Sequence, residues 1–361
     1  EAAQLGALGS PPLPLRGTVG IDATVTTDGD KERSELRLDV GSAEVEVPRL
    51  AVWKPTGVPG SMELVVIERG GAVAVERLAI EWPGAVIVGA AELDTGGRLQ
   101  TVTLDPFSLA GTELRVTGAR ADGTLALQIQ GSRLDLDPFA AGGGNAGTGT
   151  GTDVWGTQAP IAIELAVDEV VAGGTGALTG VGGRLRADRR GLTTLRLEAG
   201  IRPGEGTADL RFEPSDDEER IALSTTDLGG LTAALGLTDA LRGGRFDFVG
   251  RLTARRPQTR VTGEITAGDF VVGGAPPIVQ LLAAAPETAD LADDDLAVSR
   301  FTSPIVLSEE TLTLNDALLI ASNLALRASG EVEFAGQRLD LTGSLAPVQG
   351  LNRFIGDLPL I

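Results

Sequence analysis

Apolar and polar residues alternate along most of this chain. Between Leu324 and Phe334, apolar residues and glycines hold every second position, and arginine, serine and glutamate hold most positions between them. Residues 338–345 repeat the pattern after a short segment, Ala335-Gly336-Gln337. Because successive side chains of a strand point to opposite faces, each run predicts a strand with one apolar and one solvated face. Two such runs joined by a glycine turn predict an antiparallel hairpin.

The same alternation predicts strands along the rest of the chain, with glycine-rich turns such as Asp94-Thr95-Gly96-Gly97 between many of them. The 50 glycines among 361 residues are about twice the ordinary share of roughly 7%. Glycines inside strand patterns favour bulges or strong curvature. They are Gly118, Gly131, Gly250, Gly263, Gly330 and Gly343. The further predicted strands are Leu36–Val47, Val73–Ile80, Leu99–Leu104, Leu109–Val116, Leu125–Leu136, Ile161–Val170, Leu192–Ile201, Ala208–Phe212, Phe246–Ala254 and Val261–Val272.

Two segments follow helical spacing instead. Leu228, Leu231, Leu235 and Leu241 lie three to six residues apart in the segment Leu228–Leu241, which Gly243-Gly244 follows. Pro276–Ala285 begins with two prolines and is followed by Pro286, which fits the boundaries of a helix. Helices of about three turns are marginal alone and need packing against a sheet. We therefore expect a mostly β fold: a long, strongly curved antiparallel sheet, a taco-like groove, with two short amphipathic helices.

One segment interrupts the strand pattern. Residues 140–158 begin AAGGGNAGTGTG, a composition typical of flexible linkers. We expect an N-terminal β-sheet segment at residues 1–139 and a C-terminal β-groove segment at residues 159–361.

Most residue types on which catalysis depends are missing. The chain has no His, Cys or Tyr, and neither of its lysines, Lys31 and Lys54, follows a glycine. Catalytic triads with His, thiol chemistry and P-loops are therefore excluded. The many Asp and Glu residues do not by themselves exclude a pair of catalytic carboxylates for carbohydrate hydrolysis. These acids, however, mostly alternate on solvated faces or lie in turns, and a catalytic acid needs burial. We expect no enzymatic activity, no cofactor and no metal.

The glycine-rich and acidic segments have simpler interpretations than ligand sites. Gly174–Gly180 resembles a dinucleotide fingerprint with one residue too many, and it lacks a β-α-β context. The acidic clusters Asp216–Glu219 and Asp290–Asp295 could offer oxygen ligands to calcium, but neither has the spacing of an EF-hand loop. A turn between strands is the simpler interpretation of Gly174–Gly180. Solvated turns are the simpler interpretation of the two acidic clusters.

The net charge of −20 repels nucleic acid phosphates, so we expect no nucleic acid partner. The longest apolar stretch, near Val86–Ala91, is far shorter than the roughly 18 residues of a membrane-spanning helix. The chain starts at Glu1 without a signal peptide and ends at Ile361 on an apolar run. We therefore expect an internal fragment of a longer protein.

A sheet with one apolar face must cover that face. With few helices available, the sheet must curl, pair with a second sheet or bind an apolar ligand, and an acyl chain suits a long groove without polar features. A filled sandwich gives the same strand pattern. The helix carrying Ile278, Leu281 and Leu282 either caps the groove or packs over the sheet. The groove candidates are Val261, Ile265, Phe270, Val272, Leu324, Leu326, Val332, Phe334, Leu339 and Leu341.

Short motifs in residues 228–361 occur in a characteristic order. A short helix pattern precedes Gly243-Gly244-Arg245-Phe246, and a strand ending at Phe270 leads through Ala275-Pro276 into the second helix. This order resembles the C-terminal AsmA-like region of the AsmA-like family of Gram-negative envelope proteins, specifically the large YhdP-type members. The further matching positions are Phe301, Leu312–Leu318, Ser329–Val332, Leu339–Gly343 and Pro347–Leu360, with Leu134–Pro138 and Leu178–Gly182 on either side of the linker.

The resemblance implies a periplasmic lipid-transfer bridge, anchored to the inner membrane in the full-length protein, that carries phospholipid or another acyl-chain lipid toward the outer membrane. The chain lacks that family's N-terminal anchor and the segment after Leu358-Pro359-Leu360, so we expect membrane contact through segments absent from this chain. Its oligomeric state stays open. The alternative is a structural, adhesin-like secreted β-protein with a filled core.

Overall fold

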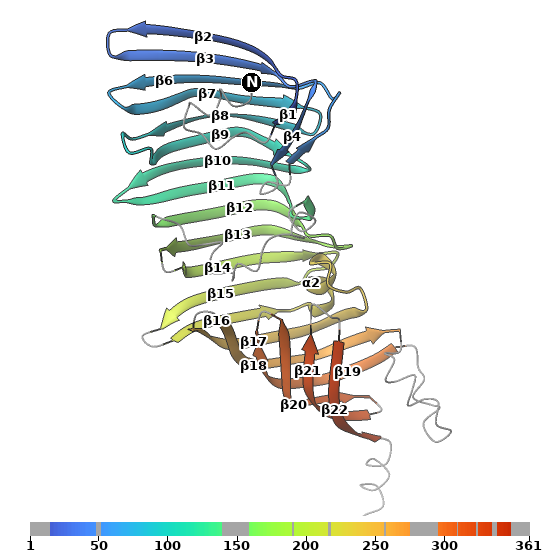
Figure 1. Cartoon of the computed structure of the whole chain (residues 1–361). Coiled ribbons are helices and arrows are strands. Elements are labelled where there is room, and N and C mark those ends of the chain that lie inside the picture. Colours follow the sequence, from blue (N-terminus) through green and yellow to red (C-terminus); the bar gives the residue numbers. More distant parts are fainter. Residues whose placement is uncertain are drawn as a thin grey trace, which may run out of the picture. The chain divides into compact units, whose positions relative to one another are not determined.

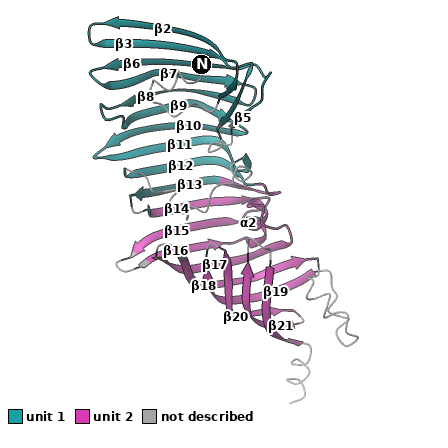
Figure 2. Ribbon diagram, in the orientation of Figure 1, with its two compact units in different colours: residues 1–172, 180–192 teal, residues 173–179, 193–361 magenta. Residues whose placement is uncertain are grey.

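The structure, a computed structural model, describes residues 15–47, 52–138, 159–189, 191–215, 218–255, 258–274, 295–308, 310–322, 324–333 and 338–347. Strands make up 78% of it, and nineteen of them belong to one large sheet, which confirms the mostly β class. The chain divides into two compact units, coloured separately in Figure 2. Unit 1 comprises residues 1–172 and 180–192, and unit 2 comprises residues 173–179 and 193–361.

In unit 1, strands follow one another across the sheet in chain order, and each pairing from β2 to β11 is antiparallel (Figure 1). Glycines with positive φ, such as Gly70 and Gly123, form the tight turns between them. The strands are β2 Gly20–Asp28, β3 Lys31–Asp39, β6 Ser61–Arg69, β7 Ala72–Trp82, β8 Ala85–Leu93, β9 Leu99–Leu109, β10 Thr112–Ala121, β11 Thr124–Asp135 and β12 Ile161–Val171.

One pairing departs from the predicted antiparallel sheet. Strands β11 and β12 run parallel, with Leu125 opposite Ile161 and Leu134 opposite Val170. A parallel pair needs a long connection that returns the chain to the starting end of the first strand. The predicted linker, residues 140–158, belongs to this connection within unit 1 and lies outside the described residues. The predicted division into two domains at residues 140–158 therefore stays a prediction. The two compact units divide the chain elsewhere, between residues 172 and 193.

A small sheet packs against unit 1's large sheet. It consists of β1 Leu15–Gly17, β4 Ala43–Val47 and β5 Val52–Lys54, in the order β1-β4-β5. Its buried residues form a core with Leu38, Trp82 and Leu109 of the large sheet. Lys54 lies inside this core with 1% of its surface exposed. Its Nζ donates hydrogen bonds to the carbonyl oxygens of Val40 at 2.6 Å, Ala43 at 2.9 Å and Pro55 at 3.3 Å. All three ammonium donors are thereby satisfied.

Unit 2 continues in chain order, with antiparallel pairings from β14 to β22. The predicted hairpin is confirmed as β21 paired with β22. Strands β13 and β14 contain the division between the units. The strands are β13 Ala177–Asp188, β14 Gly191–Arg202, β15 Thr207–Ser215, β16 Glu218–Thr225, β17 Leu241–Arg255, β18 Gln258–Gly273, β19 Asp295–Leu307, β20 Thr311–Ala321, β21 Leu324–Glu333 and β22 Arg338–Pro347.

Of the two predicted helices, one falls on described residues, and it is shorter than predicted. Helix α2 spans Leu228–Ala234, half of the predicted Leu228–Leu241. It stops because Gly236 adopts a φ of +65° and Leu241 already begins β17, where it lies opposite Val272. The other predicted helix, Pro276–Ala285, lies outside the described residues.

The predicted strong curvature is wrong, because the sheet is not strongly curled. Atoms of the neighbouring strand occupy the space beside most of the glycines within strands, backbone atoms at Gly330 and side chains at others. A Cβ at Gly118 would collide with the side chain of Leu127, and one at Gly263 would lie 2.7 Å from Cε2 of Phe248. These glycines make room for larger neighbours on the sheet face.

Candidate functional site

The antiparallel register of unit 1 aligns apolar side chains into rows that cross the strands. Because residues opposite one another point to the same face, each row is continuous from strand to strand. One row consists of Leu38, Met62, Ile80, Ile87, Phe107 and Leu114. A second consists of Leu36, Leu64, Leu78, Gly89, Leu104, Val116, Ile129 and Leu165. A third consists of Val66, Val75, Ala91, Val102, Gly118, Leu127 and Ile163. We call this surface the unit 1 apolar face.

Two β-bulges keep these rows in phase. In β7, Glu76 and Arg77 separate Val75 from Leu78, whereas β8 has a single residue at the equivalent position. In β9, Asp105 and Pro106 separate Leu104 from Phe107 in the same way. The extra residue of a bulge returns the following side chain to the face that strict alternation would make it leave. The apolar face therefore continues across both bulges.

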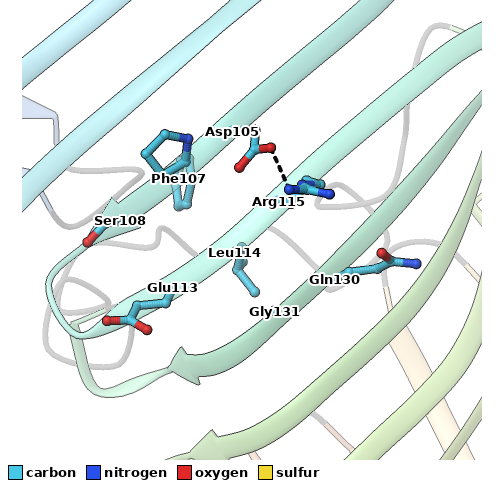
Figure 3. A pocket seen from close by; sticks show the side chains of 9 residues that line it. Asp105, Phe107, Ser108, Glu113, Leu114, Arg115, Gln130 and Gly131 are labelled. Atoms are coloured by element: carbon cyan, nitrogen blue, oxygen red, sulfur yellow. Dashed lines mark ion pairs between the residues drawn. The ribbon is translucent and has the colours of Figure 1, made fainter.

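The bulge in β9 borders a shallow hollow of about 490 Å³. Phe107, Leu114 and the glycine at position 131 line it together with polar side chains, and Figure 3 shows Asp105 directed toward Arg115. Nη2 of Arg115 lies 2.7 Å from Oδ2 of Asp105. Gly131 has no room for a side chain, because a Cβ there would lie 2.1 Å from the carbonyl oxygen of Glu113 and 2.8 Å from Cδ2 of Leu114.

The opposite face of unit 1 is charged. Arg33 forms ion pairs with Glu35 and Glu76, so the bulge residue Glu76 is held on this face. Glu63 accepts hydrogen bonds from Arg77 at 2.8 Å and from Arg37 at 3.3 Å. The hydrogen bond from Arg77 is the main cause that lowers the pKa of Glu63, and the one from Arg37 adds to it. These pairs are partly exposed and add little stability, but they keep the outer face solvated.

Unit 2 has an apolar face of the same construction. One row consists of Leu195, Phe212, Ile221, Gly250, Gly263, Ile305, Leu314, Gly330 and Leu341. A second consists of Leu197, Leu210, Leu223, Phe248, Ile265 and Ser303. A third consists of Leu252, Val261, Leu307, Leu312, Val332 and Leu339. Most of these side chains are half-buried, so the face is neither sealed nor fully solvated. We call it the unit 2 apolar face.

The structure brings four of the predicted groove residues together in a packed cluster. Phe270 and Leu324 are buried there, and Val272 and Leu326 pack against them. Ala267 belongs to the same cluster, although it stands three positions before Phe270 and in a regular strand the two side chains would point to opposite faces. Asp269, whose φ is +59°, lies between Ala267 and Phe270 and shifts the phase of the alternation. These four residues form a core and not an empty groove.

The other predicted groove residues lie apart from this cluster. Val261, Ile265 and Val332 are half-buried on the unit 2 apolar face. Leu339 and Leu341 are 67% and 38% exposed on β22. Phe334 and the three residues of the predicted capping helix, Ile278, Leu281 and Leu282, lie outside the described residues.

Helix α2 covers one margin of the unit 2 apolar face. Leu228 packs against the cluster around Phe270, and Asp227 caps the helix by accepting a hydrogen bond from the backbone N–H of Gly230 at 2.9 Å. A Cβ at Gly174 would collide with the carbonyl oxygen of Ala233, so glycine is required where this loop crosses the helix. α2 is thereby fixed by contacts on two sides.

Within the described rows of unit 2, a single charged residue lies on the apolar side. Glu219 is half-buried opposite Leu252, and burial raises the pKa of its carboxyl. Over the described residues, no three acidic, His or Cys side chains are grouped so as to hold a metal ion. The face offers apolar contact and little else.

The residues predicted from the sequence to line the groove include none of the unit 1 apolar face. In unit 2 they also omit three aromatic residues, Phe246, Phe248 and Phe301. The period-2 runs at Val73–Ile80 and Leu99–Leu104 carried the signal for unit 1. What the runs lack is register, because the rows exist only once each strand is aligned with its neighbour.

No helix in the described ranges is long and apolar enough to cross a bilayer. Comparison with protein-family models, with curated proteins and with solved structures found no match to this chain.

Proposed function

We propose that the two apolar faces bind lipid acyl chains, and that the chain is part of an AsmA-like, YhdP-type bridge that passes phospholipid across the periplasm. The observation that supports this proposal best is the run of aligned, mostly half-buried apolar rows across the strands of each unit. In unit 1 these rows lie opposite a charged face. A monomeric protein rarely leaves an apolar surface of this extent without a partner.

The energetics need no specific headgroup chemistry. Each CH₂ group that moves from water onto an apolar surface contributes about 0.8 kcal/mol. Rows of Leu, Val and Ile offer that contact along their whole length, and the side chains of Leu104 and Leu114 occupy the space beside Gly89 and Gly131. A lipid held only by its chains is free to slide, which is what a passive conduit requires. The protein contributes no catalytic step in this proposal.

The alternative, a structural β-protein with a filled core, explains part of each unit. The small sheet covers the margin of the unit 1 face around Leu38 and Trp82, and α2 covers the margin of the unit 2 face. Half-buried residues such as Val102 and Ile265 lie away from both covers. They favour lipid binding over a filled core.

The test is to purify the protein from a Gram-negative host, extract it with organic solvent and count bound phospholipid by mass spectrometry. Two pairs of variants separate the faces: Val102→Glu with Thr103→Glu in β9, and Ile265→Glu with Thr266→Glu in β18. Each pair adds the same charge at adjacent positions on opposite faces. We expect Val102→Glu and Ile265→Glu to lose most of the bound lipid, and the threonine variants to keep it.

Equal lipid content in both members of each pair would overturn the proposal, as would a folded wild-type protein without lipid. Circular dichroism of all four variants checks that the sheet is retained. Periplasmic location is tested separately, by cell fractionation of the full-length protein.

A further inference from the structure

A second hollow of unit 1, of about 500 Å³, lies among strands that are paired on both sides. Lys31 and Arg69 line it from β3 and β6, and Glu92 and Asp94 line it from β8 and the turn that follows. Lys31 stands two residues before Arg33 and so shares the charged face. The hairpin turns β2–β3, β6–β7 and β8–β9 lie at this end of the sheet (Figure 1). The hollow is therefore an interior feature of the sheet and not part of its edge.

Two alanines of β7 line the hollow between its two charged walls. Ala72 lies opposite Arg69 of β6. Ala74 lies opposite both Ile67 of β6 and Glu92 of β8. Residues opposite one another point to the same face, and an alanine side chain ends at Cβ, so the longer side chains of β6 and β8 rise above these positions. The alanines thus separate a basic wall from an acidic wall.

The basic wall holds two cations at directly opposed positions. Lys31 lies opposite Arg69 in the register of β3 and β6, and like charges in that arrangement destabilise a sheet. Nε of Arg69 lies 3.3 Å from Oδ2 of Asp30, but the two side chains are 72% and 68% exposed. Lys31 forms no ion pair with the residues that the structure describes. An anion bound between the two cations would relieve their repulsion.

The acidic wall is held in place by hydrogen bonds. Asp94 accepts hydrogen bonds from the backbone N–H of Arg98 at 3.0 Å and from Nε2 of Gln100 at 2.8 Å. The hydrogen bond from Arg98 is the main cause that lowers the pKa of Asp94, so this carboxylate stays ionised. Oε2 of Glu92 accepts a hydrogen bond from the hydroxyl of Thr101 at 3.0 Å. Both carboxylates are thus fixed across the hollow from the two cations.

We propose that this hollow binds a small zwitterion that carries a phosphate and an ammonium group, of the phosphoethanolamine type. The phosphate lies between Lys31 and Arg69, since a guanidinium group binds phosphate through two parallel hydrogen bonds. The ammonium group donates hydrogen bonds to Glu92 on the other wall. Because the hollow lies on the face opposite the apolar rows, its ligand binds independently of acyl chains on that face.

The spacing of the strands sets the size of the ligand. β6 and β8 are separated by β7, so their backbones lie about 10 Å apart. Charge-assisted hydrogen bonds of about 2.8 Å on each side leave about 4 Å between the opposite charges of the ligand. Two carbon atoms between a phosphate oxygen and an ammonium nitrogen span that distance. The contacts are exposed, so we expect weak binding.

Isothermal titration calorimetry with phosphoethanolamine, inorganic phosphate and ethanolamine is the first test. We expect phosphoethanolamine to bind about fivefold more tightly than either half, because each half contacts one wall only. Lys31→Gln should weaken phosphoethanolamine and phosphate alike, whereas Glu92→Gln should weaken phosphoethanolamine and leave phosphate unchanged. Arg37→Gln is the matched control, since it removes a positive charge from the same face of β3 outside the hollow.

Three results of the titration would overturn the proposal. They are the absence of phosphoethanolamine binding, phosphate binding as tight as that of phosphoethanolamine, and equal losses in Lys31→Gln and Arg37→Gln. Ala74→Leu tests the hollow itself, because it fills the space between the walls without changing a charge. Unchanged affinity in Ala74→Leu protein that circular dichroism shows to be folded would likewise contradict the proposal.

Phosphoethanolamine occurs as a free compound and as a lipid headgroup, and co-sedimentation with vesicles distinguishes the two sources. The vesicles are phosphatidylcholine with or without phosphatidylethanolamine, because the trimethylammonium group of choline donates no hydrogen bond to a carboxylate. Binding that requires phosphatidylethanolamine and is weakened by Lys31→Gln supports a headgroup. Binding of the soluble compound alone supports a free ligand. Failure of both forms to bind overturns the proposal.

Discussion

At the residue scale, the buried Lys54 shows how a rare side chain fixes a local structure. Its ammonium group joins three backbone carbonyls where the small sheet meets the large one. Gly60 is adapted to it, because a Cβ there would lie 2.9 Å from Cε of Lys54. Lys54 follows the apolar run Ala51–Trp53, whereas the exposed Lys31 stands between Asp30 and Glu32, but an apolar neighbour does not by itself bury a lysine. Only the packing of β4 and β5 buries one of the two lysines.

Lys54→Met should destabilise unit 1. It removes three hydrogen bonds and leaves buried carbonyls with fewer partners, which costs about 2–4 kcal/mol. Urea unfolding followed by the fluorescence of Trp53 and Trp82 measures the change. Lys31→Met, the matched control on β3, should shift the midpoint little. Equal shifts would mean that the buried hydrogen bonds do not contribute.

Glu219→Gln should stabilise the protein at neutral pH. Burial raises the pKa of Glu219 above its value in the unfolded chain, so the folded state binds its proton more tightly. Stability from this group is therefore present at low pH and falls as pH rises between the unfolded and the folded pKa. Glutamine avoids that loss.

The measurement for Glu219 is thermal unfolding of wild type and variant at several pH values. The gain of the variant should shrink as pH falls below the ordinary carboxyl range. Glu264→Gln, an exposed position on β18, is the control. A gain that is constant with pH would rule out ionisation as the cause.

At the element scale, irregular positions decide which residues share a face. The bulges at Glu76-Arg77 and Asp105-Pro106, and the positive φ of Asp269, each shift the phase of the alternation. The sequence shows the change of phase, because two polar residues stand between apolar ones in the β7 run. It does not show that the neighbouring strand keeps a single residue there. Bulges are properties of a strand pair.

Gly174→Ala should weaken the docking of α2. The added methyl would collide with the carbonyl oxygen of Ala233, and overpacking of this kind costs about 1–3 kcal/mol. Denaturant unfolding measures the loss. Gly182→Ala is the control, because a Cβ there has nothing within 4 Å. A tolerated Gly174→Ala would show that the loop and helix can separate without cost.

At the scale of the whole molecule, each unit presents an apolar face, and the net charge of −20 keeps such a chain in solution. If the apolar faces bind lipid, a lipid ligand must stabilise the folded state by mass action. Adding a lysophospholipid below its micellar concentration should raise the unfolding temperature of the wild type and of Thr266→Glu. It should raise that of Ile265→Glu less. Identical shifts in all three proteins would place the binding elsewhere.

The sequence by itself determined most strands and their two-sided character, although the predicted strands Leu36–Val47 and Leu109–Val116 each run from the end of one observed strand into the next. The predicted strand Val261–Val272 lies within β18, and Ile161–Val170 lies within β12. Period-2 alternation is a local property, and a strand expresses it wherever it pairs. The sequence likewise determined the chemistry, since a chain without His or Cys has few reactive side chains to place.

Only the tertiary structure decided what the apolar side chains do. It packed Phe270 and Leu324 into a core, left Val261 and Ile265 half-buried in rows, and left Leu339 exposed on β22. It also paired β11 with β12 in parallel and kept the sheet from curling strongly. These outcomes depend on register and on which elements cover which margin. Both are set by contacts between residues far apart in the chain, which a local pattern does not encode.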